Sequence, residues 1–260
     1  MATDPRRLYS PRLLALFERY LERYVGRQFN GLRVACSGKP PTLDRPTIVY
    51  SNHPSWWDPI VLLLAARRLF PGKRLYAPID AAALDRYCIL GRCGLFPIEP
   101  GTFQGAADFM RVARSILREP GTLLGLTAQG EFSDVRQRPL QLKGSVARLL
   151  GEDPNWQAIP VAVEYTFWNE RQPEVLLSLG RPERAAGLSK DALQARLEGS
   201  LERELDALAA LAAARDAGAF ETLVEGRRLG VGGTYDSYLA LRQRLKGQRF
   251  DPAHGAIRRE

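Results

Sequence analysis

The residues best suited to chemistry in this sequence are a histidine and an aspartate five positions apart, in the segment 52–58 that reads NHPSWWD. Histidine is the side chain that most readily exchanges a proton near neutral pH. A carboxylate that accepts a hydrogen bond from one ring nitrogen fixes the tautomer and leaves the other nitrogen to deprotonate a nucleophile. His53 as general base and Asp58 as its support are the candidate catalytic residues. By themselves they also fit a structural histidine beside a helix that Asp58 caps.

The spacing of this pair requires a particular arrangement of elements. Residues i and i+5 lie about 140° apart on an ideal helix, so the two side chains meet if His53 lies on a loop and Asp58 in a first helical turn. Residues 47–50 (TIVY) predict a short buried strand. Residues 59–70 predict a helix, with Asp58 as candidate N-cap and Pro59 at the first helical position. Such strand-to-helix junctions are where open α/β sheets place their active sites.

Three further segments follow this motif in a defined order. They are GLFPIEP at 94–100, TAQGEFS at 127–133 with LKG at 142–144 opening a helix, and the strand-like AIPVAV at 158–163. Together with the HxxxxD segment, this pattern over residues 47–165 resembles the four blocks of the glycerolipid acyltransferase superfamily, the lysophosphatidic acid acyltransferase-like enzymes.

The resemblance implies transfer of an acyl group from acyl-CoA or acyl carrier protein to a hydroxyl of a lipid acceptor. His53 would deprotonate the hydroxyl, Asp58 would orient His53, and the thioester would be attacked directly, with no catalytic cysteine, metal or further cofactor. The substrate-binding residues that it implies come from the blocks themselves: Trp57, Glu99, Gln129, Gly130, Glu131 and Lys143. Backbone amides near Gly130 would bind a thioester or acceptor oxygen. Two of these have simpler readings, Trp57 as core packing and Lys143 as a solvated helix lysine.

The departures from the family pattern concern the acceptor. Pro100 stands where the second block usually ends in an arginine that meets the acceptor phosphate, and the usual Glu-Gly-Thr-Arg of the third block reads QGEF at 129–132. Two phosphate-facing cations are absent, so plain lysophosphatidic acid is a poor acceptor, and a glycosylated isoprenoid or carotenoid or a lysolipid fits better. The alternative is a standard 1-acylglycerol-3-phosphate acyltransferase in which Arg136 or Arg138 meets the phosphate from another direction.

The remaining elements predict the fold class. Helices are expected at 103–118 and 142–150, and strands at 122–126, 158–163 and 174–179. Alternating strands and helices indicate an α/β fold, a mixed sheet covered by helices. We expect an N-terminal amphipathic helix (1–30), a catalytic domain (31–188) and a helical C-terminal extension (189–260) on the same core. The leucine stripe at 193–211 would pack on the sheet or dimerise, and the glycine-rich 230–233 would form a turn.

Composition limits the cellular locations and the partners that we expect for this protein. The 260 residues carry a net charge of +8 and 45% apolar residues, and no apolar run is long enough to span a bilayer. A polar N-terminus favours a cytoplasmic protein, peripheral on the inner face of the cell membrane. Its partners would be the acyl donor, the lipid acceptor and an anionic membrane surface, with no nucleic acid. The helix at 11–29 either packs on the core or anchors the protein to that surface. A non-catalytic basic binding protein is the alternative of another class.

Overall fold

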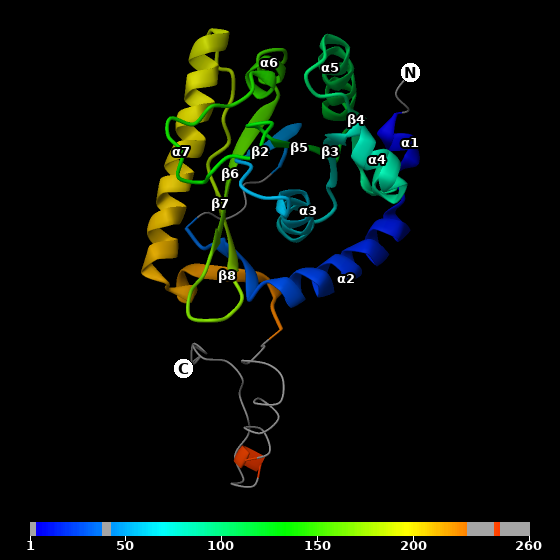
Figure 1. Ribbon diagram of the computed structural model, residues 1–260. Helices are drawn as coiled ribbons and strands as arrows, with labels where there is room; N and C mark the ends of the chain where they lie inside the picture. The colour runs from blue at the N-terminus through cyan, green and yellow to red at the C-terminus, as the bar shows by residue number, and fades with distance from the viewer. Residues whose placement is uncertain (1–3, 38–42, 228–241, 245–260) are drawn as a thin grey trace.

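The strand predicted at residues 47–50 lies at the centre of an eight-stranded mixed sheet in the computed structural model, which describes residues 4–37, 43–227 and 242–244 (Figure 1). The strand order is β4-β3-β5-β2-β6-β7-β1-β8. The five strands from β4 to β6 run parallel, whereas β7 is antiparallel to β6, and β8 is antiparallel to β1. The strands are β1 (Gly31–Ala35), β2 (Thr47–Ser51), β3 (Arg74–Asp80), β4 (Leu95–Ile98), β5 (Thr122–Thr127), β6 (Gln157–Thr166), β7 (Glu174–Leu179) and β8 (Phe220–Glu225).

Helices cover both faces of the sheet, which is why β2 is apolar along its length. Ile48 and Tyr50 point into one apolar cluster and Val49 into the other, as the period of two requires. Figure 1 shows α3 on the opposite side of the strands from α5 and α6. The helices are α1 (Pro5–Leu8), α2 (Pro11–Gln28), α3 (Asp58–Leu69), α4 (Ala81–Arg86), α5 (Phe103–Leu117), α6 (Ser145–Leu150) and α7 (Lys190–Ala214), with short 3₁₀ turns η1 (Cys88–Cys93) and η2 (Ala217–Ala219).

The N-terminal helix α2 has a buried face and an exposed face. Leu14, Leu21 and Val25 lie in the same apolar cluster as α3, so the helix is part of the core. Leu16 and Tyr20 are 66% and 57% exposed on its outer side. The helix therefore packs on the core through one face, and its other face can contact a surface.

The leucine stripe near the C-terminus packs on the sheet. Leu193, Leu197, Leu201, Leu205 and Leu208 are buried, and α7 lies against β6 and β7. Of the two predictions for this stripe, packing on the sheet is therefore the one that the structure shows. The predicted turn at 230–233 lies outside the described residues.

Several elements were not predicted from the sequence. Strands β1, β3 and β8 are short or mixed in composition, and the motif segment at 94–100 contains β4, which was not among the predicted strands. The C-terminal region is helical over α7 but also contributes β8 to the sheet edge. Within the described ranges, no helix is both long and apolar enough to cross a membrane.

Candidate active site

The loop that leaves β2 is held in place before it reaches the histidine. The buried side chain of Asn52 accepts a hydrogen bond from the amide of Val163 at 2.8 Å and donates one to the carbonyl of Val163 at 2.9 Å. These bonds tie the end of β2 to β6, where the antiparallel partner β7 lies on the far side. The chain therefore enters the HxxxxD segment from a fixed point at the carboxyl edge of the parallel strands.

His53 and Asp58 form the pair that the sequence predicted. Nδ1 of His53 lies 2.6 Å from Oδ2 of Asp58, and the carboxylate is fully buried while the imidazole is 16% exposed. His53 lies on the loop and Asp58 is the first residue of α3, so the awkward spacing is resolved as expected. Because the carboxylate accepts from Nδ1–H, Nε2 is the ring atom that carries the free lone pair in the neutral form.

One expectation about Asp58 was wrong. The N-cap of α3 is Trp57, and Asp58 makes no side-chain capping bond within the helix. Its Oδ2 accepts from the amide of Ser55 at 3.0 Å as well as from His53, and its Oδ1 accepts from the hydroxyl of Tyr165 at 2.7 Å. The carboxylate is thus committed to holding the histidine, and the positive end of the α3 dipole adds to its stabilisation.

Tyr165 belongs to this site although the sequence did not single it out. Burial first, and then the charge and hydrogen bond of Asp58, raise the pKa of the Tyr165 phenol well above its ordinary value. The phenol therefore stays protonated and acts as a donor to Asp58. A tyrosine two residues beyond the predicted strand 158–163 carries no recognisable signal, because only the pairing of β6 with β2 brings it to Asp58.

The loop after β5 holds the backbone of His53 from the other side. The buried Gln129 accepts from the amide of His53 through Oε1 at 2.7 Å, and the amide of Ser133 donates to the His53 carbonyl at 3.0 Å. Both peptide groups that flank His53 are therefore fixed by the third block. Gln129, predicted to bind substrate, contacts the loop that carries His53 in this structure.

Phe132 packs against the ring of His53. The two ring centroids are 4.5 Å apart and the ring planes are tilted by 44°, while Phe132 is 63% exposed. The position where the family pattern has an arginine thus presents an aromatic ring beside His53. In the sequence, Phe132 was notable only because it replaces the arginine of the family pattern.

The other third-block residues cluster beside this loop. Gly130 has φ of +69°, and its amide donates to the carbonyl of Thr127 at 3.1 Å, so this amide is turned inward. A Cβ on Gly130 would lie 3.0 Å from Cγ of Lys143, which places the stem of that lysine against the loop. Glu131 and Lys143 are both exposed. Gly130 and Lys143 are therefore brought together, with Glu131 at the surface next to them.

Glu99 and Trp57 lie apart from the His53 ring. Glu99 is exposed after β4, which is three strands from β2, about 14 Å across the sheet. Trp57 packs edge-on against Phe29 at 4.9 Å and near Tyr24 at 5.1 Å between centroids, in the layer formed by α2 and α3. Substrate-binding roles for both residues stay predictions.

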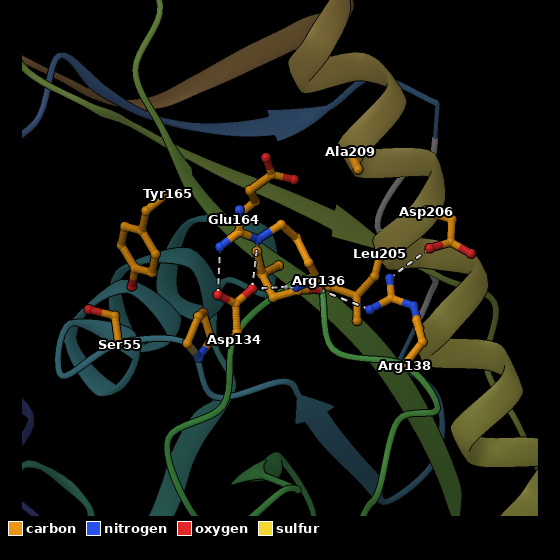
Figure 2. Close-up of a pocket in the computed structure, with 11 residues that line it drawn as sticks. Ser55, Asp134, Arg136, Arg138, Glu164, Tyr165, Leu205, Asp206 and Ala209 are labelled. Atoms are coloured by element: carbon orange, nitrogen blue, oxygen red, sulfur yellow. Dashed lines mark hydrogen bonds and ion pairs between the residues drawn. The ribbon is translucent and has the colours of Figure 1, made fainter.

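A pocket of about 650 Å³ opens next to the loop that carries His53. Its wall includes Ser55 and Tyr165, the two neighbours of Asp58, and Figure 2 shows the Tyr165 hydroxyl turned toward Ser55. The opposite wall comes from the loop after β5 and from α7. The complete lining is Pro54, Ser55, Asp134, Val135, Arg136, Arg138, Glu164, Tyr165, Leu205, Asp206 and Ala209.

The charges in this pocket are largely paired. Arg136 contacts Asp134 at 2.7 Å, and Arg138 contacts Asp206 at 2.6 Å (Figure 2). The hydrogen bonds from Arg136 hold the pKa of Asp134 well below its ordinary range, so Asp134 is ionised and offsets that guanidinium. Burial alone raises the pKa of Glu164, the fifth charged group of the lining.

Comparison with known proteins supports the fold. No protein-family model matches the chain, and no curated protein matches it by sequence. Among solved structures, the 1-acyl-sn-glycerophosphate (LPA) acyltransferase PlsC from Thermotoga maritima superposes with a TM-score of 0.52 at 18% identity, over 75% of this chain and 79% of that one. At this identity the likeness shows a shared fold and nothing about activity.

Proposed function

We propose that this chain is a membrane-surface O-acyltransferase of the glycerolipid acyltransferase superfamily. The observation that carries the proposal is the hydrogen bond from His53 to a fully buried, triply bonded Asp58 at the carboxyl edge of the sheet. The shared fold with an acyltransferase and the ordered four-block sequence pattern point to the same chemistry.

In the proposed reaction, Nε2 of His53 takes the proton of the acceptor hydroxyl as its oxygen attacks the thioester carbonyl. The new C–O bond forms, the C–S bond breaks, and the leaving thiolate takes the proton back from His53. Asp58 holds the imidazole in the required tautomer and stabilises its charged form. The products are an ester and the free thiol of CoA or acyl carrier protein.

The developing oxyanion needs donors that are free before substrate binds. The Gly130 amide is occupied by Thr127. The next two amides, of Glu131 and Phe132, donate to no group in the part of the chain that the structure describes. They are therefore better candidates, and Lys143 beside Gly130 suits a phosphate of the donor.

Plain lysophosphatidic acid remains a doubtful acceptor. Phe132 stands beside His53 where the family pattern has an arginine, and Glu131 is its neighbour. A phosphomonoester at this position would meet a carboxylate and would lack the arginine of the family pattern, which is unfavourable. The solved structure of similar fold is described as an LPA acyltransferase, so that acceptor is the specific alternative to test.

The membrane surface would be met by the outer face of α2. Exposed Leu16 and Tyr20 lie among Arg12, Arg19 and Arg23, the mixture that suits the headgroup layer. Tyr20 stacks on Tyr24, which contacts Trp57 of the HxxxxD segment. This aromatic series leads from the outer face of the helix to the catalytic loop, on the cytoplasmic side of the cell membrane.

The test is purified protein with an acyl-CoA panel and vesicles made from a total lipid extract, with thiol release and mass spectrometry as readouts. We expect one lipid to gain an acyl mass, and His53→Ala and Asp58→Asn to lower kcat by roughly 10²–10⁴-fold while the far-ultraviolet spectrum is retained. Cys88→Ser, which changes an exposed thiol, should keep full activity because no acyl-enzyme forms. Undiminished transfer by His53→Ala would contradict the proposal. Salt-sensitive nucleic-acid binding without any transfer would favour a non-catalytic basic protein.

A further inference from the structure

We infer that the pocket between the loop after β5, the end of β6 and α7 binds the headgroup of an uncharged, hydroxyl-rich acceptor lipid, with Glu164 as the residue that determines this specificity. The inference rests on the proposed acyl transfer and names the class of acceptor for it. It is carried by the place of the pocket, by its charge balance and by the kinds of hydrogen-bonding groups in its wall.

The pocket adjoins the catalytic pair. Pro54 and Ser55, which directly follow His53, form one wall, and Tyr165, which donates to Asp58, forms the next. A headgroup held there lies beside the loop that carries the general base. The volume of about 650 Å³ accommodates a sugar-sized group.

The balance of charge in the pocket disfavours a phosphomonoester. The lining holds two guanidinium groups against three carboxyl groups, and each arginine is paired with its own aspartate. Arg138 is further committed to the carbonyls of Val135 and Gln137, each at 2.9 Å. No cation is left over to neutralise a phosphate, which would instead meet the carboxyl group of Glu164.

The same lining suits hydroxyl groups. A sugar hydroxyl both donates and accepts, and the pocket offers carboxylate acceptors together with guanidinium, Ser55 and Tyr165 donors. Val135, Leu205 and Ala209 supply an apolar patch for the carbon face of a ring.

Glu164 is the acidic group of this wall that has no arginine paired with it in the described residues. Its side chain is half-buried on β6 and lines the pocket together with Ser55 and Tyr165. As a lining residue it can bind hydroxyls of the headgroup while the reacting hydroxyl gives its proton to His53 and takes the acyl group from the thioester.

The experiment measures kcat/KM with acyl-CoA and phosphatidylcholine vesicles that contain either monoglucosyl diacylglycerol or lysophosphatidic acid. We expect the wild-type protein to acylate the glucosyl lipid more efficiently. Glu164→Ala should lower kcat/KM for that lipid at least tenfold with KM for acyl-CoA unchanged, and Glu164→Gln, which keeps an acceptor oxygen, should lose less. Glu164→Lys should shift the preference at least tenfold toward lysophosphatidic acid. Glu221→Ala, on the exposed side of β8, is the matched control.

The contrary outcomes separate the two proposals. Transfer to lysophosphatidic acid alone, unaffected by any Glu164 substitution, would overturn the headgroup assignment and leave the acyltransferase proposal intact. A raised KM for acyl-CoA in Glu164→Ala would assign the pocket to the donor and overturn the inference likewise. Absence of His53-dependent transfer to either lipid would defeat the proposed function and the inference with it.

Discussion

The hydroxyl of Tyr165 donates a 2.7 Å hydrogen bond to Oδ1 of Asp58, the carboxylate whose Oδ2 holds His53. The three side chains come from β6, α3 and the loop after β2. The tyrosine therefore links the orientation of the His53 imidazole to the sheet itself. Because Tyr165 also lines the pocket, the same residue connects the His53–Asp58 pair to that pocket.

Tyr165→Phe should weaken catalysis without abolishing it. A hydrogen bond to a charged acceptor is worth about 1.5–3 kcal/mol, so we expect a loss of roughly tenfold or more in kcat/KM. A carboxylate with one donor fewer holds the imidazolium more tightly, so the acidic limb of the pH–rate profile should move to higher pH. The measurement is the profile of kcat/KM between pH 5 and 9. Tyr87→Phe, at an exposed site, is the control and should change neither kcat/KM nor the position of the acidic limb. If the acidic limb does not move in Tyr165→Phe, Tyr165 does not position His53 through Asp58.

Gly130→Ala should cost both stability and activity. Its φ of +69° is unfavourable for alanine by about 1–2 kcal/mol, and the loop that it shapes carries Gln129 and Ser133, which hold the backbone of His53. Gly121→Ala is the matched control, since Gly121 has φ of +78° and open space around it. Both variants should unfold at lower temperature, measured by circular dichroism, and only Gly130→Ala should lose acyl transfer. Equal activities for the two variants would show that the loop geometry does not serve catalysis.

Glu164→Gln should change stability in a pH-dependent manner. Burial raises the pKa of this carboxyl group, so the folded protein binds its proton more tightly than the unfolded chain does. Wild-type stability therefore falls as the pH rises from the unfolded pKa through the folded one, and the cost persists above it. The variant lacks this cost, so its stability relative to wild type should increase between pH 4 and pH 7.5. Denaturant unfolding at the two pH values measures this change, and a constant difference would argue against a desolvated Glu164.

Leu16→Ser with Tyr20→Ser should weaken vesicle binding while the fold persists. Both side chains are exposed, whereas Leu14 and Leu21 hold α2 in the core, so deletion of the helix would confound binding with unfolding. Cosedimentation with anionic vesicles measures the effect, and we expect at least a tenfold loss of partitioning. Leu188→Ser, remote along the chain and also exposed, serves as control. Equal binding by the double variant would remove α2 from the membrane contact.

The sequence by itself predicted the α/β fold class and the pair His53–Asp58. The apolar run at 47–50 and the proline in the first turn of α3 are local signals, and local physics decides them. The resemblance to the four family blocks then related segments between residues 47 and 165 to one site, which hydrophobic periodicity could not do. Gln129 and Gly130 were singled out in this way, although the contact of Gln129 with the His53 amide was not foreseen.

The tertiary structure decided which distant residues complete the site. Tyr165 meets Asp58, and Phe132 meets His53, only because β5 and β6 flank β2 in parallel and end at the same edge. The pocket that Ser55 and Tyr165 line likewise depends on α7 packing against β6, about 40 residues further along the chain. Strand order and helix docking are set by the burial of non-local apolar surface, which no short window of sequence contains.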